Sequence, residues 1–218
     1  MPSSLAADRR GGIAGVTFVV LLVAQAVLLG QPKQPNASAR AIAGWLADHR
    51  GPALASSYML VLATVLFLFF AVALCRRLEA WGAPDDMMAV ARLSAMLGLS
   101  MYMAISAVQV ANVYLVSHTS ADTTKALNAV EYVGGNLSGI PFGIFLVIVG
   151  WTARKTPAAP KWLAWSALLV GVADFASAGA FAQRGAFAAA GPVALLGALL
   201  YVWVLGASIH LLRARPLT

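Results

Sequence analysis

Residues 141–172 read PFGIFLVIVGWTARKTPAAPKWLAWSALLVGV and contain two apolar segments joined by a short basic loop, RKTPAAPK at 154–161. Pro157 and Pro160 punctuate this loop, as prolines commonly do between helices. A membrane-spanning helix needs roughly 17–25 predominantly apolar residues, and each segment belongs to a stretch of about that length. The two segments therefore predict a pair of transmembrane helices with a basic connection between them.

The composition of the whole chain agrees with this prediction. Of its 218 residues, 61% are hydrophobic and only 11% are charged, and the mean hydropathy is +0.80. A soluble domain has about 25% charged residues, so this apolar surplus is too large for a globule of this size to bury. Apolar segments recur to the C-terminus, which distinguishes the first of them from a secretory signal peptide. The chain is therefore predicted to be an integral membrane protein with the lipid bilayer as its solvent.

Six segments have the length and hydrophobicity of a membrane span. They lie near residues 12–30, 53–75, 89–116, 138–153, 162–183 and 192–212. Short connectors separate them, such as GQPKQP at 30–35 and WGAPDD at 81–86, and none is long enough to divide the chain into two domains. The sequence predicts an all-α fold, with one polytopic transmembrane bundle of six helices over residues 1–218.

The Lys and Arg residues favour one side of this bundle, and such residues are retained on the cytoplasmic side of a membrane. With the N-terminus inside, the inner side has Arg9, Arg10, Arg76, Arg77, Arg92, Arg154, Lys155, Lys161, Arg213 and Arg215, and the outer side has Lys33, Arg40, Arg50, Lys125 and Arg184. Both termini are therefore predicted to be cytoplasmic, in a multi-pass protein of the cell inner (plasma) membrane. The net charge of +7 reflects this topology, because the basic residues are scattered and do not form a nucleic-acid-binding patch.

Two outer connections have the pattern of short amphipathic helices. In residues 38–51 the apolar residues recur at helical spacing, Ser38 is a suitable N-cap, and Trp45 is expected to anchor the helix at the membrane interface. Residues 120–133 show the same spacing more weakly. Such helices serve either as lids over a site or as plain interfacial connectors, and the pattern leaves both open.

The depth of the polar residues is the main functional signal. Each span except the sixth has a hydrogen-bonding side chain in its outer half, whereas the inner halves are apolar, as in VLFLFFAVAL. These side chains form a polar layer of candidate ligand-binding residues: Gln25, Tyr58, Gln109, Asn112, Asn136, Ser138 and Asp174. Because they share one level, we expect them to line a cavity that opens outward.

Asp174 is the most informative residue of this layer. It lies roughly 18 Å from the inner end of its span, and a carboxylate inside a membrane costs about 2.5–3.5 kcal/mol on insertion scales. An acid at this depth is therefore a functional candidate, as the protonatable centre of a binding site. The alternative is a structural acid, either protonated or paired with Arg184 or a neighbouring amide. Glu131 is expected to be an exposed acid of a loop.

Residues 134–136 and the glycines that follow suggest a special backbone ahead of the fourth span. The residues Gly134-Gly135-Asn136 are expected to break the helix at membrane depth, with the next helix starting near Ser138 and Pro141 in its first turn. A broken helix of this kind can direct its N-terminus into a site. The alternative is a helix-packing face, in which Gly135, Gly139 and Gly143 let a neighbouring helix approach closely.

Catalysis and metal binding have little support in the sequence. Ser138 and His210 are predicted at opposite ends of their spans, so they cannot form a nucleophile–base pair. The single cysteine, Cys75, excludes an internal disulfide. An outer metal site from Asp48, His49, His118 and Glu131 is conceivable, but no spacing favours it. The sequence identifies no catalytic residue, no metal site and no cofactor.

The segment at 141–172 also resembles the signature of an uncharacterised family of small bacterial six-helix integral membrane proteins. The matching residues are Phe142, Gly143, Gly150, Trp151, Pro160, Lys161, Trp162, Leu163, Ala164 and Trp165. The resemblance covers about a seventh of the chain and implies the six-helix architecture but no activity or site residue. Trp151, Trp162 and Trp165 are expected to anchor the bundle at the inner interface.

Three functions are compatible with these patterns. The first is an outward-facing polar cavity that binds or transports a small molecule or ion, with Asp174 at its centre. The second is a non-catalytic partner or sensor subunit whose small-residue helix faces pack against another chain, including a homo-oligomer. The third is a membrane enzyme acting on a lipid or quinone-like substrate, which lacks a paired acid and base in the sequence.

Overall fold

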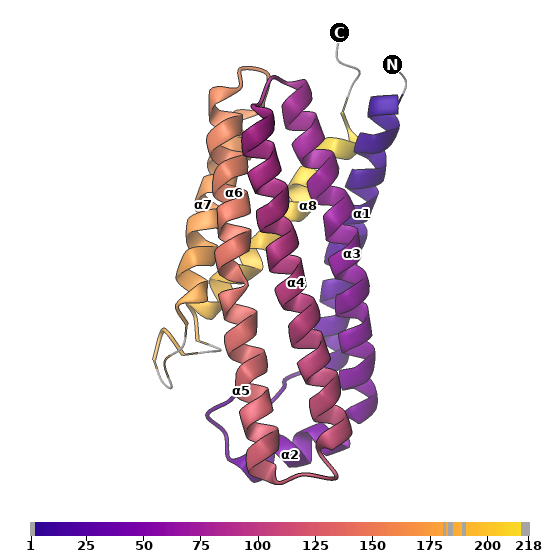
Figure 1. Cartoon of the computed structure of the whole chain (residues 1–218), viewed down its shortest axis with the longest axis vertical. Coiled ribbons are helices and arrows are strands. Elements are labelled where there is room, and N and C mark those ends of the chain that lie inside the picture. The colour runs from indigo at the N-terminus through magenta and orange to yellow at the C-terminus, as the bar shows by residue number, and fades with distance from the viewer. Residues whose placement is uncertain (1–2, 181, 183–184, 189–190, 215–218) are drawn as a thin grey trace.

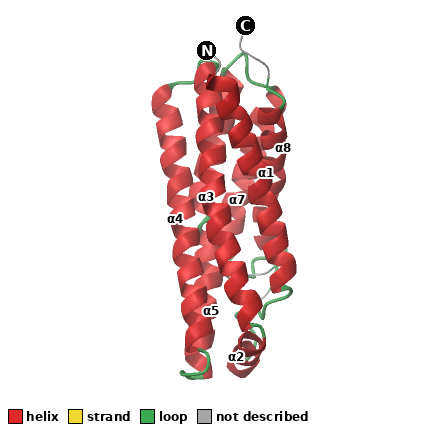
Figure 2. Cartoon of the chain, turned by 90° about the vertical axis from the view of Figure 1, so that its right-hand side faces the viewer, coloured by secondary structure: helices red, strands yellow, loops and turns green. Residues whose placement is uncertain are grey.

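The computed structural model describes residues 3–180, 182, 185–188 and 191–214, and these are almost entirely helical (Figures 1 and 2). The helices are α1 (Ser3–Leu29), α2 (Ala39–Asp48), α3 (Arg50–Ala80), α4 (Asp85–Leu115), α5 (Ala121–Leu137), α6 (Gly139–Lys155), α7 (Lys161–Ala178), the 3-10 helix η1 (Ala194–Ala198) and α8 (Leu199–Leu212). No strand occurs in the described ranges, where a single isolated bridge joins Ala182 and Ala188. The prediction of an all-α fold is confirmed.

The helices form an elongated antiparallel bundle (Figure 1). α1 packs against α3 and α8, α4 lies between α3 and α6, and α7 packs against α6. The described chain begins and ends at one end of the bundle, here called the termini end, and α2 lies across the opposite end, here called the α2 end (Figure 1). Every Lys and Arg expected on the inner side, apart from Arg215 outside the described residues, belongs to a segment near the termini end.

The described part of the chain contains five helical segments long and apolar enough to cross a membrane. They are Leu5–Leu29, Arg50–Ala80, Asp85–Leu115, Ala121–Lys155 and Ala194–Leu212. α7 has 18 residues and is not among them, because Lys161 and Asp174 lower its hydropathy. These long apolar helices are consistent with the predicted membrane character of the chain, whereas the six-span count stays a prediction.

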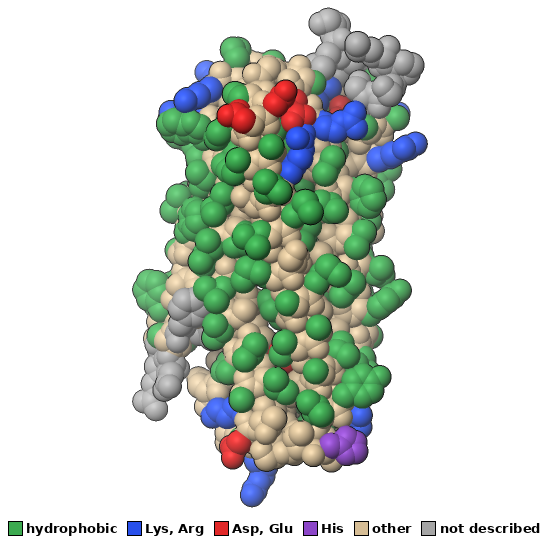
Figure 3. All heavy atoms as spheres, in the orientation of Figure 1, with side chains coloured by type: hydrophobic (Ala, Val, Ile, Leu, Met, Phe, Trp, Pro, Cys, Tyr) green, Lys and Arg blue, Asp and Glu red, His purple; other side chains and the backbone are tan. Residues whose placement is uncertain are grey.

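On the face that Figure 3 shows, apolar side chains are spread over the middle of the bundle and charged side chains lie at its two ends. Val27, Leu169 and Val202 are 78%, 70% and 69% exposed, and exposing such apolar side chains to water carries a free-energy cost. Many exposed apolar side chains between two charged ends are typical of a surface that contacts lipid rather than water.

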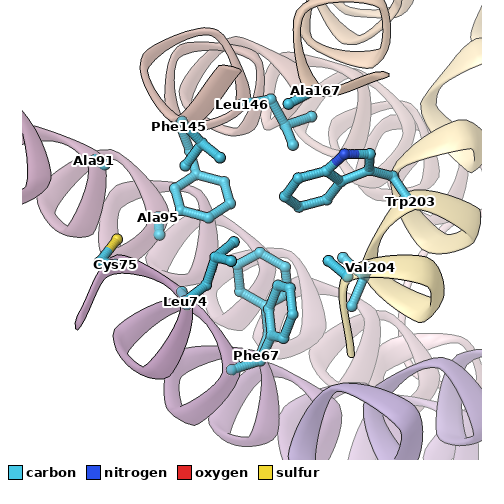
Figure 4. Close-up of a cluster of buried hydrophobic side chains, with 14 of the residues drawn as sticks. Phe67, Leu74, Cys75, Ala91, Ala95, Phe145, Leu146, Ala167, Trp203 and Val204 are labelled. Atoms are coloured by element: carbon cyan, nitrogen blue, oxygen red, sulfur yellow. The ribbon is translucent and has the colours of Figure 1, made fainter. Parts of the chain in front are cut away.

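The apolar core lies toward the termini end and is built around aromatic rings (Figure 4). Phe67 is fully buried and meets Phe145 at a ring-centroid distance of 5.9 Å in an edge-to-face arrangement. Phe145 and Trp203 meet in the same way at 6.4 Å. These rings join α3, α6 and α8, so the termini half of the bundle is tightly packed and apolar, as the inner-half sequences predict.

Aromatic and basic side chains surround the termini end. The Arg154 guanidinium lies 4.6 Å from the ring centroid of Trp151 and 5.6 Å from that of Trp165. Trp151, Trp162 and Trp165 are 42%, 45% and 58% exposed, which leaves their rings free to contact the membrane interface. Trp45 differs, because it is half-buried and stacks on His49 at 4.6 Å.

Of the two short outer helices predicted from the sequence, one is present as predicted and the other is part of a longer helical segment. The helix predicted over residues 38–51 is present as α2, where the Ser38 hydroxyl accepts a hydrogen bond from the Ala41 amide and Ile42 and Leu46 are buried. The helix expected over residues 120–133 is not a short surface helix. It is α5, which extends to Leu137, packs along α4 and continues into α6 (Figure 1).

The expected backbone break at residues 134–136 is wrong, because all three residues are helical. Only Ser138 interrupts the path from α5 to α6, and its φ of −62° and ψ of −19° are still right-handed helical. The helix is interrupted at Ser138 because Pro141 has no N–H to donate to the carbonyl of Leu137. Hydrogen bonds from Ser138 to Gly134 (3.1 Å) and from Phe142 to Ser138 (3.3 Å) carry the helix across this position.

Two of the three predicted packing glycines lie against a neighbouring helix. A Cβ atom at Gly139 would lie 2.7 Å from the Asp174 carbonyl oxygen, and one at Gly143 would lie 3.0 Å from the Gly171 carbonyl oxygen. α6 and α7 therefore approach too closely for any side chain at these positions. Gly135 differs, since a Cβ there would meet nothing within 4 Å.

Candidate functional site

Two adjacent cavities lie in the α2 half of the bundle. The inner chamber has a volume of about 260 Å³ and lies between α4, the α5–α6 junction, α7, η1 and α8. The outer chamber has a volume of about 450 Å³ and lies between α1, α2, α4 and α5. The residues that line both are Tyr102, Gly135, Asn136, Ala194, Leu195 and Tyr201. The two chambers are therefore neighbours that share part of their walls.

Asp174 lies in the last turn of α7 and lines the inner chamber. Its residue surface is 1% exposed, and neither carboxyl oxygen has a hydrogen-bond partner among the described residues. Ser177 does not supply one, because its hydroxyl donates to the Asp174 backbone carbonyl at 2.8 Å. A buried carboxyl group without partners is costly, so its presence beside a cavity calls for a ligand or ordered water.

Two tyrosines stand where the inner and outer chambers meet. Tyr102 of α4 and Tyr201 of α8 line both chambers, and their hydroxyl oxygens are 3.4 Å apart. The Tyr102 ring packs against Phe142 of α6, with a centroid distance of 5.4 Å. Neither tyrosine was among the residues predicted from the sequence. The sequence feature that could have identified them is a tyrosine within an apolar span. Tyrosine is common in membrane helices as an interface anchor, so this feature alone does not indicate a site.

The α5–α6 junction supplies the polar wall next to Asp174. The Asn136 side-chain amide donates to the Ala180 carbonyl at 2.8 Å, which ties α5 to the segment that follows α7. The Ser138 hydroxyl donates to the Gly135 carbonyl at 2.5 Å and the residue is 1% exposed. Gly135 itself leaves space in the wall, since no side chain fills it. Asn136 and Ser138, the two predicted ligand-binding residues of this junction, therefore line the inner chamber.

Amide side chains of α4 form the wall of the outer chamber. The Gln109 side-chain oxygen accepts a hydrogen bond from the Ser57 hydroxyl at 2.9 Å. The Asn112 side-chain nitrogen donates to the Thr124 carbonyl and to the Glu131 carboxylate, both at 3.2 Å. The expectation that Glu131 is an exposed loop acid is wrong. It is half-buried and lines the outer chamber, because α5 packs along α4.

The outer chamber reaches the surface at the α2 end. Its rim includes Lys33, an exposed residue of the loop between α1 and α2. Gln25 of α1 is half-buried in its wall, and Trp45 and Ile42 of α2 close it from the side. Residues of α2 and of the α1–α2 loop therefore both form part of the chamber wall at this end.

The structure brings six of the seven predicted ligand-binding residues to these chambers. Those that line them are Gln25, Gln109, Asn112, Asn136, Ser138 and Asp174. Tyr58 is apart from them: it is 66% exposed and lines a separate apolar groove between α3 and α4. Ser57, the residue before it, faces Gln109 of α4. Because consecutive helical residues lie about 100° apart around the axis, Tyr58 points outward.

Other candidate residues lie away from the chambers. Arg184, the expected partner of Asp174, lies outside the described residues. Cys75 is fully buried in the apolar core, and His210 lies between Trp81 and Trp162 at the termini end. In the described ranges no group of three or more His, Cys, Asp and Glu side chains is arranged to hold a metal ion.

The geometry of the two chambers is the ground for a functional proposal. Comparison of the chain with protein-family models, with curated proteins and with solved structures gives no match.

Proposed function

We propose that this chain is a six-span protein of the cell inner (plasma) membrane that binds a small molecule or ion in the two adjacent chambers. The observation that carries this proposal is the Asp174 side chain, which is buried, lines a cavity and has no hydrogen-bond partner among the described residues. A ligand would supply the missing partner. We further propose that the ligand is transported and that protonation of Asp174 couples its movement; unchanged uptake in Asp174→Asn would contradict this.

The proposed orientation has the termini end in the cytoplasm and the chambers open to the outside. The Lys and Arg side chains at the termini end support it, because these residues are enriched on the cytoplasmic side of a membrane. Asp174 is 13 positions after Lys161, or about 20 Å along the helix axis, in the outer half of a hydrocarbon core about 30 Å thick. α3 and α4 have 31 residues each, about 46 Å, so they extend beyond the core at the α2 end.

The partner-subunit alternative loses its main support in this arrangement. Gly139 and Gly143 contact α7, and a Cβ atom at Gly12 would lie 2.8 Å from the Ser208 carbonyl oxygen of α8. These small-residue faces are therefore used within the chain and are not free to pack against another one. The enzyme alternative lacks, among the described residues, a nucleophile and base within reach of each other around Asp174.

Native mass spectrometry of the detergent-purified protein tests the binding proposal. We expect a non-lipid adduct on the wild type that is lost in Asp174→Asn, because the amide cannot replace the carboxylate in a charge-assisted hydrogen bond. Ser208→Ala is the matched control, since Ser208 is also buried and without a partner in the described chain but lines neither chamber. An adduct that survives in Asp174→Asn would contradict the assignment of the site.

Cysteine labelling tests whether the chambers contain water and open outward. In a Cys75→Ala background, Gly135→Cys places a thiol in open space between the two chambers. We expect this thiol to react in intact spheroplasts with the membrane-impermeant reagent MTSET. Ala167→Cys is the control, because Ala167 is fully buried in the apolar core and should stay unlabelled. An unreactive Gly135→Cys protein would mean that the chambers are closed or dry, which contradicts the proposal.

A further inference from the structure

The walls of the chambers indicate the charge of the ligand, provided that the proposed binding function holds. We propose that the chambers bind a small organic cation with an aromatic or aliphatic body and a protonated amine. The amine would lie at Asp174, and its body would lie against the rings of Tyr102, Tyr201 and Phe142.

The charges that line the chambers favour a cation. Asp174 lines the inner chamber and Glu131 lines the outer one. No Lys, Arg or His lines the inner chamber among the described residues. Lys33 lines the outer chamber, but it is exposed at the rim and hydrated there. An anion entering the inner chamber would meet a carboxyl group and no basic partner, and burial of like charges is strongly unfavourable.

The Asp174 carboxyl group has the hydrogen-bonding capacity that an ammonium group needs. Both of its oxygens are buried and without partners in the described chain, and an ammonium group has N–H donors for both. Such charge-assisted bonds are shorter and stronger than neutral ones, and stronger still where water is scarce. A neutral alcohol offers a single donor and no compensating charge.

A bare metal ion fits this site less well than an amine. Calcium takes six to eight oxygen ligands, and magnesium needs near-octahedral geometry. The inner chamber offers one carboxyl group, and no cluster of three acids, histidines or cysteines occurs in the described ranges. Its walls also include three aromatic residues: Tyr102 and Phe142 pack together with their ring centroids 5.4 Å apart, and the Tyr201 hydroxyl lies 3.4 Å from that of Tyr102. Aromatic faces attract organic cations through the ring quadrupole.

The two chambers also have the size and order of an entry path for such a cation. Their volumes of about 260 and 450 Å³ together fall in the range of small-molecule pockets, about 300–1,000 Å³. A cation entering at the α2 end would pass Glu131 before it reaches Asp174. Acidic groups in a narrow cleft raise the local concentration of cations and speed their entry.

The test compares three probes of one shape and different charge: 2-phenylethylamine, 2-phenylethanol and phenylacetate. Binding is measured by isothermal titration calorimetry on the detergent-purified wild type, Asp174→Asn and Ser208→Ala. We expect the amine to bind the wild type and Ser208→Ala alike, at least about tenfold more tightly than the alcohol or the acid, which corresponds to about 1.4 kcal/mol. In Asp174→Asn the amine should lose this advantage.

A second measurement does not depend on the folding of an Asp174 variant. In the Cys75→Ala, Gly135→Cys protein, the amine should slow MTSET labelling, and the alcohol and the acid at equal concentration should not. Equal binding or equal protection by the three probes, amine binding that persists in Asp174→Asn, or no amine binding at all would overturn the inference. If the thiol introduced at position 135 reacts with MTSET but the amine shows no advantage, only the ligand class is wrong. If that thiol is unreactive, the proposed function fails as well.

Discussion

Asp174→Asn is expected to make the ligand-free protein more stable, by about 1–3 kcal/mol in the free energy of unfolding. The wild-type carboxyl group is 1% exposed and has no hydrogen-bond partner among the described residues, so the folded state bears the cost of its desolvation. Asparagine has nearly the same shape and carries no charge. Equilibrium unfolding in SDS or a thermal melt of the delipidated protein measures the difference.

The sign of this change separates a binding residue from a structural one. If Asp174 held helices together through a charged partner, its removal would destabilise the fold by about 3–5 kcal/mol, as breaking a buried ion pair does. Asp48→Asn is the control, because Asp48 is exposed at the end of α2 and its replacement should change stability by less than about 0.5 kcal/mol. A large loss of stability in Asp174→Asn would favour the structural alternative.

Asp8→Asn is expected to produce the largest loss of stability, about 3 kcal/mol. The Asp8 carboxylate accepts a hydrogen bond from the Arg77 guanidinium at 3.1 Å, and the two side chains are 7% and 8% exposed. This pair joins α1 to α3 at the termini end of the bundle. Removing the Asp8 carboxylate breaks this buried ion pair, and breaking a buried pair is strongly destabilising. The same unfolding assay measures the effect.

The matched control for Asp8→Asn is the second ion pair in the described part of the chain. Arg92 and Glu79 join α4 to α3 at 2.5 Å, but their side chains are 28% and 22% exposed. Solvent screens this pair, so Glu79→Gln should cost about 0–1 kcal/mol. Equal losses in the two variants would show that burial does not distinguish the pairs and would contradict the prediction.

The depth pattern in the sequence located most of the candidate site. Gln25, Gln109, Asn112 and Asp174 could be found because a polar side chain is costly in a membrane span, and a helix position converts directly into a depth. Tyr58 shows the limit of this reasoning. It has the right depth but lies on the lipid side of α3, and depth does not specify the direction of a side chain around the bundle.

The segment at residues 120–138 was the least predictable from sequence. Its glycines and polar residues favour a surface helix and a break, since glycine and asparagine have low helix propensity. Packing against α4 keeps it helical as α5, and this places Glu131 and Asn136 in the chamber walls. Tertiary packing outweighed local propensity here, as it routinely does.

By itself, the sequence determined the class of the molecule: an all-helical membrane chain with basic, aromatic residues at one end and a polar layer nearer the other. These properties follow from composition and spacing, because the free energy of transfer from water to lipid depends on the type of each residue. Only the tertiary structure decided that Tyr102 and Tyr201 join this layer, that Tyr58 does not, and that Asp174 lies in a cavity without a partner among the described residues. These facts depend on how each helix is rotated about its axis and which helices it contacts. Side-chain packing between helices that are distant in sequence sets both, so no single segment of the sequence determines them.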